Sequence, residues 1–259
     1  DEYDTAFFDK RSKFIHYKPD VLVINNIEFD HVDIFSNVDQ IIWQFHQLLR
    51  TLSPQTKVIA NGDDLNIQKL FELGVWSEID YFGSSISDKK KWTCILDDLG
   101  QYNLSLKGKK LESINSKLFG QHNMLNTTAA IAALANLGLN HRELIASAQN
   151  FNGVKRRLEY IGQFSSIHLF DDFAHHPTAI KASMEAMRSK FLSSQLYAIV
   201  ELASNTMRKG SLKADLKESF AAADFVWILD YGDVDWDIQE EFMSIKNIGI
   251  VKNMDDLSS

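Results

Sequence analysis

The stretch VLVINN, Val21–Asn26, contains four consecutive apolar residues followed by two asparagines. An unbroken, partly β-branched apolar run is typical of a strand buried on both faces of a parallel sheet, and the asparagines indicate the loop after it. Apolar residues of the segment 38–52 then fall on one stripe of a helix. KVIANGD, Lys57–Asp63, repeats the pattern of strand and loop. The order strand, helix, strand predicts a parallel α/β sheet.

The remainder of the first half extends this sheet. Short alternating runs between 79 and 119, around the turn Lys107–Lys109, predict antiparallel strands. The pair Asn152-Gly153 marks a break in the chain, and we expect one domain over 1–153 and a second over 154–259. Three segments of the first domain predict helices: 65–73, 123–137 and 142–151.

Beyond the break, helical segments separate four apolar runs that predict strands. This alternation is typical of a doubly wound α/β domain. The expected fold class is therefore α/β, with a parallel-sheet domain that carries an antiparallel extension, and a Rossmann-like C-terminal domain. The four predicted strands are 167–170, 196–200, 225–229 and 248–251.

Composition excludes several classes of function. With 27 basic and 35 acidic side chains, the net charge of −8 lacks the broad positive field that attracts nucleic acid. No apolar run reaches the ~18 residues that cross a bilayer, so no membrane partner is expected. The single cysteine, Cys94, cannot form an internal disulfide and indicates a reducing compartment, by default the cytoplasm. No secretory signal follows Asp1, and we expect the sequence to be a fragment.

The loop after the first strand is acidic and contains a histidine. Ligands bind at the carboxyl ends of strands in open α/β sheets, and Mg²⁺ takes one or two protein ligands beside phosphate and water. Glu28, Asp30, His31 and Asp33 are therefore candidate metal ligands. The alternative is a solvated acidic loop without a ligand.

GQHNMLN, Gly120–Asn126, stands where the helix over 123–137 begins. The N–H groups and the positive dipole end of a helix N-terminus favour a phosphate, and an Asn amide can pair with an adenine edge. A nucleotide contact is one interpretation of this segment. The other is that an Asn simply caps the helix.

A third cluster joins Arg156-Arg157 to the DDFAHHP segment, Asp171–Pro177. A carboxylate after a strand can accept a hydrogen bond from a ribose hydroxyl, and a guanidinium can bind phosphate. Alternatively, Asp171 or Asp172 caps the next helix, and the paired histidines bind a metal or nothing. Ser204–Thr206, after another predicted strand, could contact substrate or form a polar turn.

Taken in order, five segments resemble the Mur ligase family, and within it the enzymes that join UDP-N-acetylmuramate to L-alanyl-γ-D-glutamyl-meso-diaminopimelate in peptidoglycan recycling. The resemblance implies a cytoplasmic bacterial ligase that uses ATP and Mg²⁺ and forms an amide through an acyl phosphate. The chain would hold much of the central ATPase domain and most of the C-terminal domain. The segments are DEYDTAFFDKRSK (Asp1–Lys13), NNIEFDH (Asn25–His31), GQHNMLN (Gly120–Asn126), RRLE (Arg156–Glu159) and DDFAHHPTA (Asp171–Ala179).

The resemblance also implies roles for single residues. His31 is similar to a ligand of a second Mg²⁺, supported by Glu28 and Asp30, and Arg157 to an arginine that reaches toward ATP; these two, His31 and Arg157, are the expected catalytic residues. The remaining expected contacts are to adenine (His122, Asn123, with Asn126 on the same helix), to ribose (Asp172) and to substrate (His175, His176, Ser204, Asn205).

Several features depart from the family pattern. No GxxxxGK[ST] phosphate loop occurs in the 259 residues, so we expect that loop, and a magnesium-binding glutamate, to precede Asp1, and the chain alone to be inactive. His46 stands where several relatives have a carbamylated lysine. Ala203 stands where an arginine is expected, which leaves open how the peptide is bound.

Four alternatives remain open at this point. Two lie within the same class: a ligase that adds L-alanine to UDP-N-acetylmuramate, and a folylpolyglutamate-type ligase. A metal-dependent hydrolase would need Asp30, His31 and Asp33 to converge with His175-His176 around two metals about 3.5–4 Å apart. A non-catalytic binding module is the fourth. No sequence feature indicates an oligomeric state.

Overall fold

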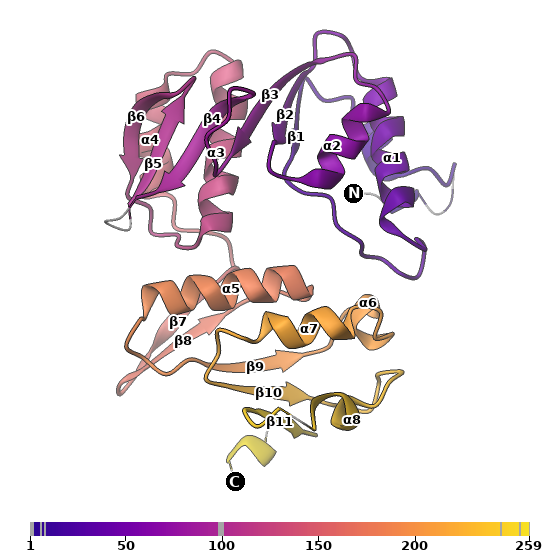
Figure 1. Ribbon diagram of the computed structural model, residues 1–259, viewed down its shortest axis with the longest axis vertical. Coiled ribbons are helices and arrows are strands. Elements are labelled where there is room, and N and C mark those ends of the chain that lie inside the picture. Colours follow the sequence, from indigo (N-terminus) through magenta and orange to yellow (C-terminus); the bar gives the residue numbers. More distant parts are fainter. Residues whose placement is uncertain are drawn as a thin grey trace. The chain divides into compact units, whose positions relative to one another are not determined.

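The computed structural model describes residues 3–5, 7, 9–97, 101–243, 245–253 and 255–258. Residues 1, 2, 6 and 8, which belong to the first motif, therefore lie outside the described residues. The chain divides into two compact units, one of residues 1–29 and 34–151 and the other of residues 30–33 and 152–259 (Figure 1). Among the described residues, no helix is long and apolar enough to span a membrane.

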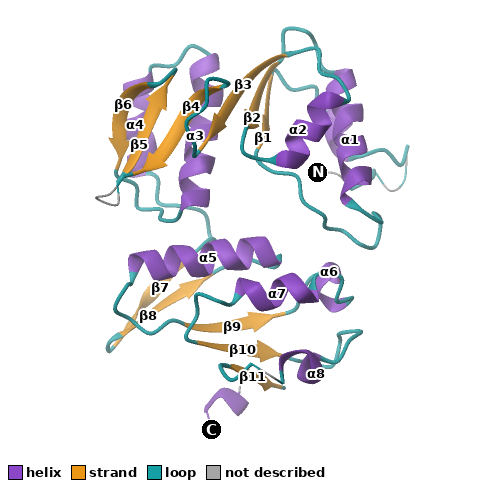
Figure 2. Cartoon of the chain, in the orientation of Figure 1, coloured by secondary structure: helices purple, strands orange, loops and turns teal. Residues whose placement is uncertain are grey.

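The first unit contains a six-stranded sheet in the order β1-β2-β3-β4-β5-β6 (Figure 2). β1, β2, β3 and β4 are parallel to one another, and β5 is antiparallel to both β4 and β6. The carboxyl ends of β1, β2 and β3 therefore lie at one edge, where α/β sheets bind ligands. The strands are β1 Val21–Ile24, β2 Lys57–Asn61, β3 Glu78–Gly83, β4 Lys90–Leu96, β5 Tyr102–Leu106 and β6 Lys109–Ile114.

The expectation of antiparallel strands over 79–119 is confirmed for the runs 92–96 and 102–106, which pair as β4 and β5, and is wrong for β3. β3 is parallel to β2 and to β4, and the antiparallel part begins only between β4 and β5. Alternation of apolar and polar residues indicates a strand but does not fix the direction of its partners.

Helices cover both faces of this sheet. Successive residues of β2 point to opposite sides: Ile59 packs in a core with α3 and α4 residues, whereas Val58 and Ala60 pack with α1 and α2 residues. All three are fully buried, so β2 is covered on both faces. The prediction of a buried strand is wrong for most of β1, which is the end strand of the described sheet: Ile24 is buried, but Val23 is exposed. The helices are η1 Lys13–His16, α1 Val38–Thr51, α2 Leu65–Glu72, α3 Gln121–Asn136 and α4 His141–Asn150.

The second unit contains a three-stranded parallel sheet in the order β11-β10-β9 and a separate antiparallel pair, β7 and β8. Val226 and Ile228 of β10 are fully buried at the centre of its core. The α/β class is confirmed. The elements are β7 Glu159–Phe164, β8 Ile167–Asp171, α5 Pro177–Lys190, β9 Tyr197–Glu201, α6 Asn205–Arg208, α7 Lys213–Ser219, β10 Phe225–Leu229, α8 Ile238–Phe242, β11 Ile248–Val251 and η2 Asp255–Ser258.

The predicted strand 167–170 exists as β8, but its partner differs from the doubly wound expectation. It pairs antiparallel with β7, which the sequence did not predict. Most side chains of the two strands are exposed, so no buried apolar run marks β7. The turn between them uses Ser165 at φ +56°, without the Asn-Gly signal of a tight hairpin.

Candidate functional site

The loop after β1 is held against the start of α2. The Ile27 side chain is buried, its amide donates to the Asp64 carboxylate (3.1 Å), and its carbonyl accepts from Asn66 (2.7 Å). The Asn26 amide donates to Glu28 Oε1 at 2.7 Å. The acidic loop is thus anchored at its middle, and Glu28 is held by its own loop.

The start of α3 carries the predicted adenine residues. The helix begins after Gly120, at φ +90°, and Gly120 offers no side-chain cap to the first turn. Asn123 lies inside the first turn and donates its amide to the carbonyl of Phe119 (2.9 Å). The interpretation of an Asn as the helix cap is therefore wrong, because the capping residue is a glycine. His122 lies beside Asn123 and is half-buried.

One hydrogen bond joins these two segments. Asn25 Nδ2 donates to Asn126 Oδ1 at 2.9 Å, which links the carboxyl end of β1 to the second turn of α3. The start of the NNIEFDH motif therefore contacts the GQHNMLN motif within the first unit. Asn25 was not among the predicted site residues, although it opens the NNIEFDH motif.

In the second unit, two arginines gather around Phe173. The guanidinium carbons of Arg156 and Arg157 lie 5.0 and 5.7 Å from the Phe173 ring centre, and the Phe173 amide donates to the Arg156 carbonyl. Arg156 also pairs with Asp171 (Nε–Oδ2, 3.3 Å). Both arginines are exposed, so the RRLE motif presents two guanidinium groups at the surface beside the acidic pair.

Asp172 is held by a helix. The Ser183 hydroxyl of α5 donates to Asp172 Oδ2. The residue that caps α5 is His176, whose Nδ1 accepts from the Thr178 amide at 3.3 Å, and Pro177 follows at the first helical position. The alternative in which Asp171 or Asp172 caps this helix is therefore wrong.

The remaining predicted substrate residues lie around α6. His175 Nδ1 is 2.9 Å from the Phe173 carbonyl, and the Ser204 hydroxyl donates to the His175 carbonyl at 3.3 Å. Ser204 also caps α6 by accepting from the Met207 amide. Asn205 is exposed. The structure thus brings the paired histidines and the Ser204 turn together.

Asp30 and His31 group with this second unit. The Asp30 carboxylate accepts from the Thr206 hydroxyl and from the His31 amide (2.7 Å). Burial opposes ionisation of Asp30, but these hydrogen bonds, with the charges of His31 and His176, lower the pKa of its carboxyl. Asp30 is therefore ionised and already hydrogen-bonded.

A metal cage of protein ligands is not formed. Within the ranges that the structure describes, no group of three or more His, Cys, Asp or Glu side chains could hold a metal. A two-metal hydrolase site would require such a convergence, so nothing here favours that alternative. The residues fit only a cation that takes most of its ligands from phosphate and water, as Mg²⁺ does.

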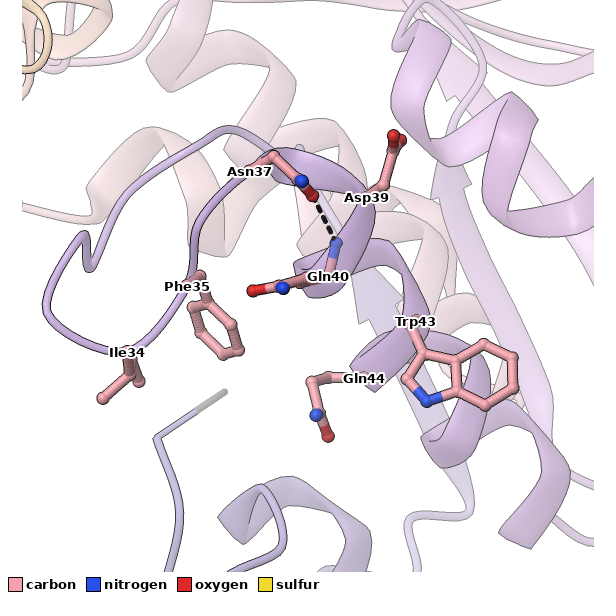
Figure 3. Close-up of a pocket in the computed structure, with 7 residues that line it drawn as sticks. All are labelled: Ile34, Phe35, Asn37, Asp39, Gln40, Trp43 and Gln44. Atoms are coloured by element: carbon pink, nitrogen blue, oxygen red, sulfur yellow. Dashed lines mark hydrogen bonds between the residues drawn. The ribbon is translucent and has the colours of Figure 1, made fainter.

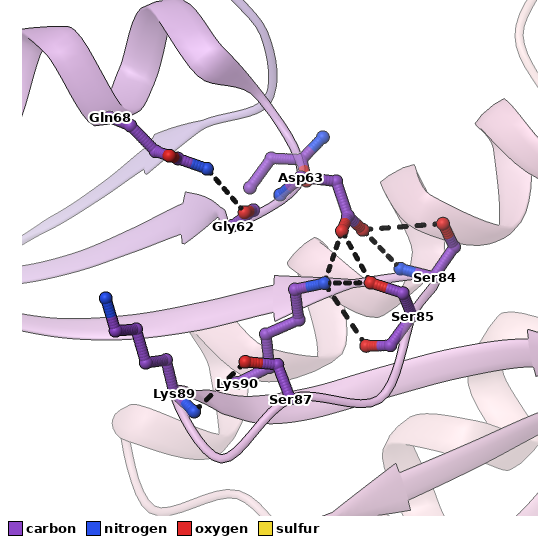
Figure 4. A network of polar contacts seen from close by, with 9 residues as sticks. Gly62, Asp63, Gln68, Ser84, Ser85, Ser87, Lys89 and Lys90 are labelled. Atoms are coloured by element: carbon purple, nitrogen blue, oxygen red, sulfur yellow. Dashed lines mark hydrogen bonds and ion pairs between the residues drawn. The ribbon is translucent and has the colours of Figure 1, made fainter.

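A polar network closes the carboxyl ends of β2 and β3 (Figure 4). Lys90, whose side chain is 5% exposed, donates to the Asp63 carboxylate and to the Ser85 hydroxyl and carbonyl, and the Ser84 amide donates to Asp63 (2.7 Å). A Cβ on Gly83 would collide with Asp63, so the close approach requires glycine there. The network therefore occupies the carboxyl ends of β2 and β3 with protein side chains.

A cavity of about 420 Å³ lies elsewhere, at the N-terminal half of α1. Figure 3 shows Asn37 accepting from the Gln40 amide at its rim, with Phe35 and Trp43 providing apolar walls. None of its lining residues is a predicted site residue. This cavity is therefore not the site predicted from the motifs.

His46, which the resemblance matched to a carbamylated lysine, is an interior residue. It is 8% exposed, and its ring centre lies 5.6 Å from that of Trp43 and 6.0 Å from that of Trp76. Neither ring nitrogen has a hydrogen-bond partner among the described residues. Its surroundings are those of a packing position.

Comparison with known proteins shows the family. Residues 5–134 match the Mur ligase middle domain, and residues 156–259 match the Mur ligase, glutamate ligase domain. The chain belongs to the Mur ligase family. This confirms the resemblance drawn from the motifs.

Two relatives of this Mur ligase chain are named for ligation to L-alanyl-gamma-D-glutamyl-meso-2,6-diaminoheptandioate. It is 39% identical over 243 residues to the UDP-N-acetylmuramate--L-alanyl-gamma-D-glutamyl-meso-2,6-diaminoheptandioate ligase of Escherichia coli (strain K12), covering 93% of this chain and 52% of that protein. The Haemophilus influenzae protein of the same name is 37% identical, with 93% and 53% coverage. UDP-N-acetylmuramate--L-alanine ligases match at 28–32% identity.

A solved structure of a murein peptide ligase is also similar to this chain. The murein peptide ligase of Psychrobacter arcticus 273-4 matches with a TM-score of 0.67 and 34% identity, over 99% of this chain and 54% of that one. The chain spans about half the length of the relatives it matches.

Proposed function

We propose that the protein is an ATP-dependent ligase that joins UDP-N-acetylmuramate to the tripeptide L-alanyl-γ-D-glutamyl-meso-diaminopimelate, in cytoplasmic peptidoglycan recycling. The observation that supports this most strongly is the difference in identity between two groups of relatives. Ligases named for the tripeptide reaction are 37–39% identical over 93% of the chain, whereas those named for L-alanine are 28–32% identical.

The first unit offers a position for the nucleotide. α3 begins after Gly120, which offers no side-chain cap, and the positive dipole end of a helix favours an anion or a polar ring edge. Asn123 and His122 stand in this turn, and Asn126 is held by Asn25. We assign His122, Asn123 and Asn126 to the adenosine part of ATP.

The second unit offers the other groups. Arg157 presents an exposed guanidinium beside Phe173, suited to bind phosphoryl oxygens, and Asp172 is suited to accept from a ribose hydroxyl. ATP would supply the phosphoryl group that activates the muramoyl carboxylate, with Mg²⁺ neutralising charge. The chain's own residues bind and orient the reactants, which is the main source of rate acceleration in such transfers.

The cation would take His31 as a protein ligand. Asp30 accepts from Thr206 and the His31 amide, and Glu28 accepts from Asn26, so both carboxylates hold the loop that carries His31. We propose that Glu28 and Asp30 shape the loop and that His31 contacts the cation.

The reaction itself provides the test. Full-length protein is supplied with ATP, Mg²⁺, UDP-N-acetylmuramate and the tripeptide, and ADP and the UDP-muramoyl-tripeptide are measured by coupled assay and mass spectrometry. We expect both products in equal amounts. If neither product forms with active E. coli ligase as a positive control, the proposal is wrong.

A competition assay separates the L-alanine alternative. Free L-alanine and the tripeptide are offered together at equal concentration, and the two UDP-linked products are resolved by mass. The tripeptide product should dominate. Predominance of UDP-muramoyl-alanine would move the protein to the alternative reaction while keeping it in the family.

A further inference from the structure

Two segments that are 176 residues apart meet at one hydrogen bond in the second unit. The Thr206 hydroxyl donates to Asp30 Oδ1, and the same oxygen accepts from the His31 amide at 2.7 Å. Thr206 is 2% exposed, so its hydroxyl is committed to this contact and is not open to substrate. The interpretation of this turn as a substrate contact therefore does not hold for Thr206.

The turn that carries Thr206 is fixed from several sides. Ser204 caps α6, the Trp236 indole donates to the Met207 carbonyl at 2.9 Å, and the Asp235 amide donates to the Arg208 carbonyl at 2.8 Å. The Trp236 ring also packs on Gly210, where a Cβ would lie 2.7 Å from the ring. Thr206 therefore offers its hydroxyl from a rigid position.

The segment that receives this hydrogen bond is strained. His31 has φ +56°, a left-handed conformation that residues with a side chain rarely adopt. The hydrogen bond from the His31 amide to its neighbouring carboxylate favours this conformation. An Asp30 carboxylate free to rotate would hold the His31 backbone less well.

We infer that Thr206 is a positioning residue: its hydroxyl fixes the Asp30 carboxylate and, through it, the left-handed backbone from which the His31 imidazole is presented. This inference rests on the proposed function only where it concerns His31 in the reaction. The backbone part stands on the hydrogen bonds alone. Sequence spacing gave no sign of it, since Thr206 and Asp30 belong to different motifs.

The first experiment measures the backbone in the 259-residue chain. Amide hydrogen exchange and the ¹⁵N–¹H chemical shift of His31 are compared among wild type, Thr206→Val and Thr206→Ser. We expect the Val variant to exchange the His31 amide about tenfold faster, which corresponds to losing about 1.4 kcal/mol of local restraint. Ser, which keeps the hydroxyl, should restore the wild-type exchange and shift.

A matched control tests whether any lost buried hydroxyl has this effect. Ser219 is 1% exposed and donates only within its own helix, to the Leu216 carbonyl. Ser219→Ala should destabilise the fold to a similar degree and leave the His31 amide unchanged. If it accelerates His31 exchange as Thr206→Val does, the effect is general loosening and the inference is wrong.

The second experiment measures catalysis in the full-length protein. Thr206→Val should lower kcat about tenfold or more while KM for the tripeptide changes little, because a misplaced group costs transition-state rather than ground-state binding. Thr206→Ser should recover most of kcat. A folded Thr206→Val protein with wild-type kcat would overturn the inference.

The two failures are distinguishable. If wild-type full-length protein forms no ligase product, the proposed function is wrong, and His31 exchange still decides whether Thr206 holds the backbone. If wild type is active and Thr206→Val changes neither kcat nor exchange, the proposed function stands and Thr206 has no positioning role.

Discussion

The side-chain amide of Asn25 donates a hydrogen bond to that of Asn126 over 2.9 Å, across 101 residues of chain. This bond ties the loop after β1 to α3 at the carboxyl end of that strand. The side-chain carbonyl oxygen of Asn25, Oδ1, is buried and has no hydrogen-bond partner among the described residues. The two asparagines therefore contribute unequally to stability.

We expect Asn126→Ala to lower the free energy of unfolding by about 1–2 kcal/mol, because it leaves the half-buried Asn25 amide without its acceptor. Asn25→Ala should cost less, because it also removes a buried oxygen that has no partner. Urea unfolding of both variants and of the double variant measures this. Equal costs, or the reverse order, would contradict the assignment.

The Asp63–Lys90 network predicts a pH dependence. Burial opposes ionisation of Asp63, but hydrogen bonds from Lys90, Ser84 and Ser85 outweigh it, and the pKa of this carboxyl is lowered. A carboxyl whose pKa is lower in the folded than in the unfolded state stabilises the fold at pH values above its unfolded pKa of about 3.9. This stabilisation is lost as the pH falls through the folded pKa.

The difference in unfolding free energy between wild type and Asp63→Asn should therefore be greatest near pH 7 and shrink below about pH 4. Urea midpoints at several pH values measure it. Asp88→Asn, at an exposed position of the following loop, is the matched control and should show a small, flat difference. A difference in unfolding free energy between wild type and Asp63→Asn that does not change with pH would contradict the prediction.

Cys94 should be unreactive in the folded protein. Burial in the sheet core raises the pKa of its thiol to about 11, so almost no thiolate exists at pH 8. Ellman's reagent should label it slowly in buffer and stoichiometrically in urea. Rapid labelling of the native chain would show that β4 opens readily.

His46 should tolerate an apolar ring. Because neither ring nitrogen has a hydrogen-bond partner in the described part of the chain, His46→Phe removes two buried polar atoms and should leave stability unchanged or raise it by about 1 kcal/mol. His46→Lys should destabilise, since an ammonium would be buried between two indoles. Thermal unfolding measures both, and loss of stability in His46→Phe would indicate an unseen partner.

Local sequence signals were sufficient for much of the fold. β2 and β10 are apolar runs with buried centres, and β1 is an apolar run that forms a strand although only Ile24 is buried. Gly138 follows the end of α3 at φ +88°, a left-handed conformation that favours glycine. The direction of β3 and the pairing of β7 with β8 were not predictable. Both depend on partners rather than on the periodicity of the strand itself.

The site was predictable as motifs but not as contacts. The motif residues around Asn25 and Asn126 do meet, yet Asn25 itself was missed. Thr206 and Ser183 were missed as partners because they act by hydrogen-bonding Asp30 and Asp172, and such pairings across the chain leave no trace in spacing. His176 as a helix cap was missed because Asp is the commoner capping residue.

Asp172 directly follows the exposed β7–β8 pair, but its carboxylate is held by a helix rather than by the two strands. A two-stranded ribbon is only marginally stable in water, and most of its side chains are solvated. Asp172, however, is bound by Ser183 on a helix that packs into the core. Fraying of the ribbon can therefore leave this acid where it is, whereas Ser183→Ala would release it even though the strands stay intact.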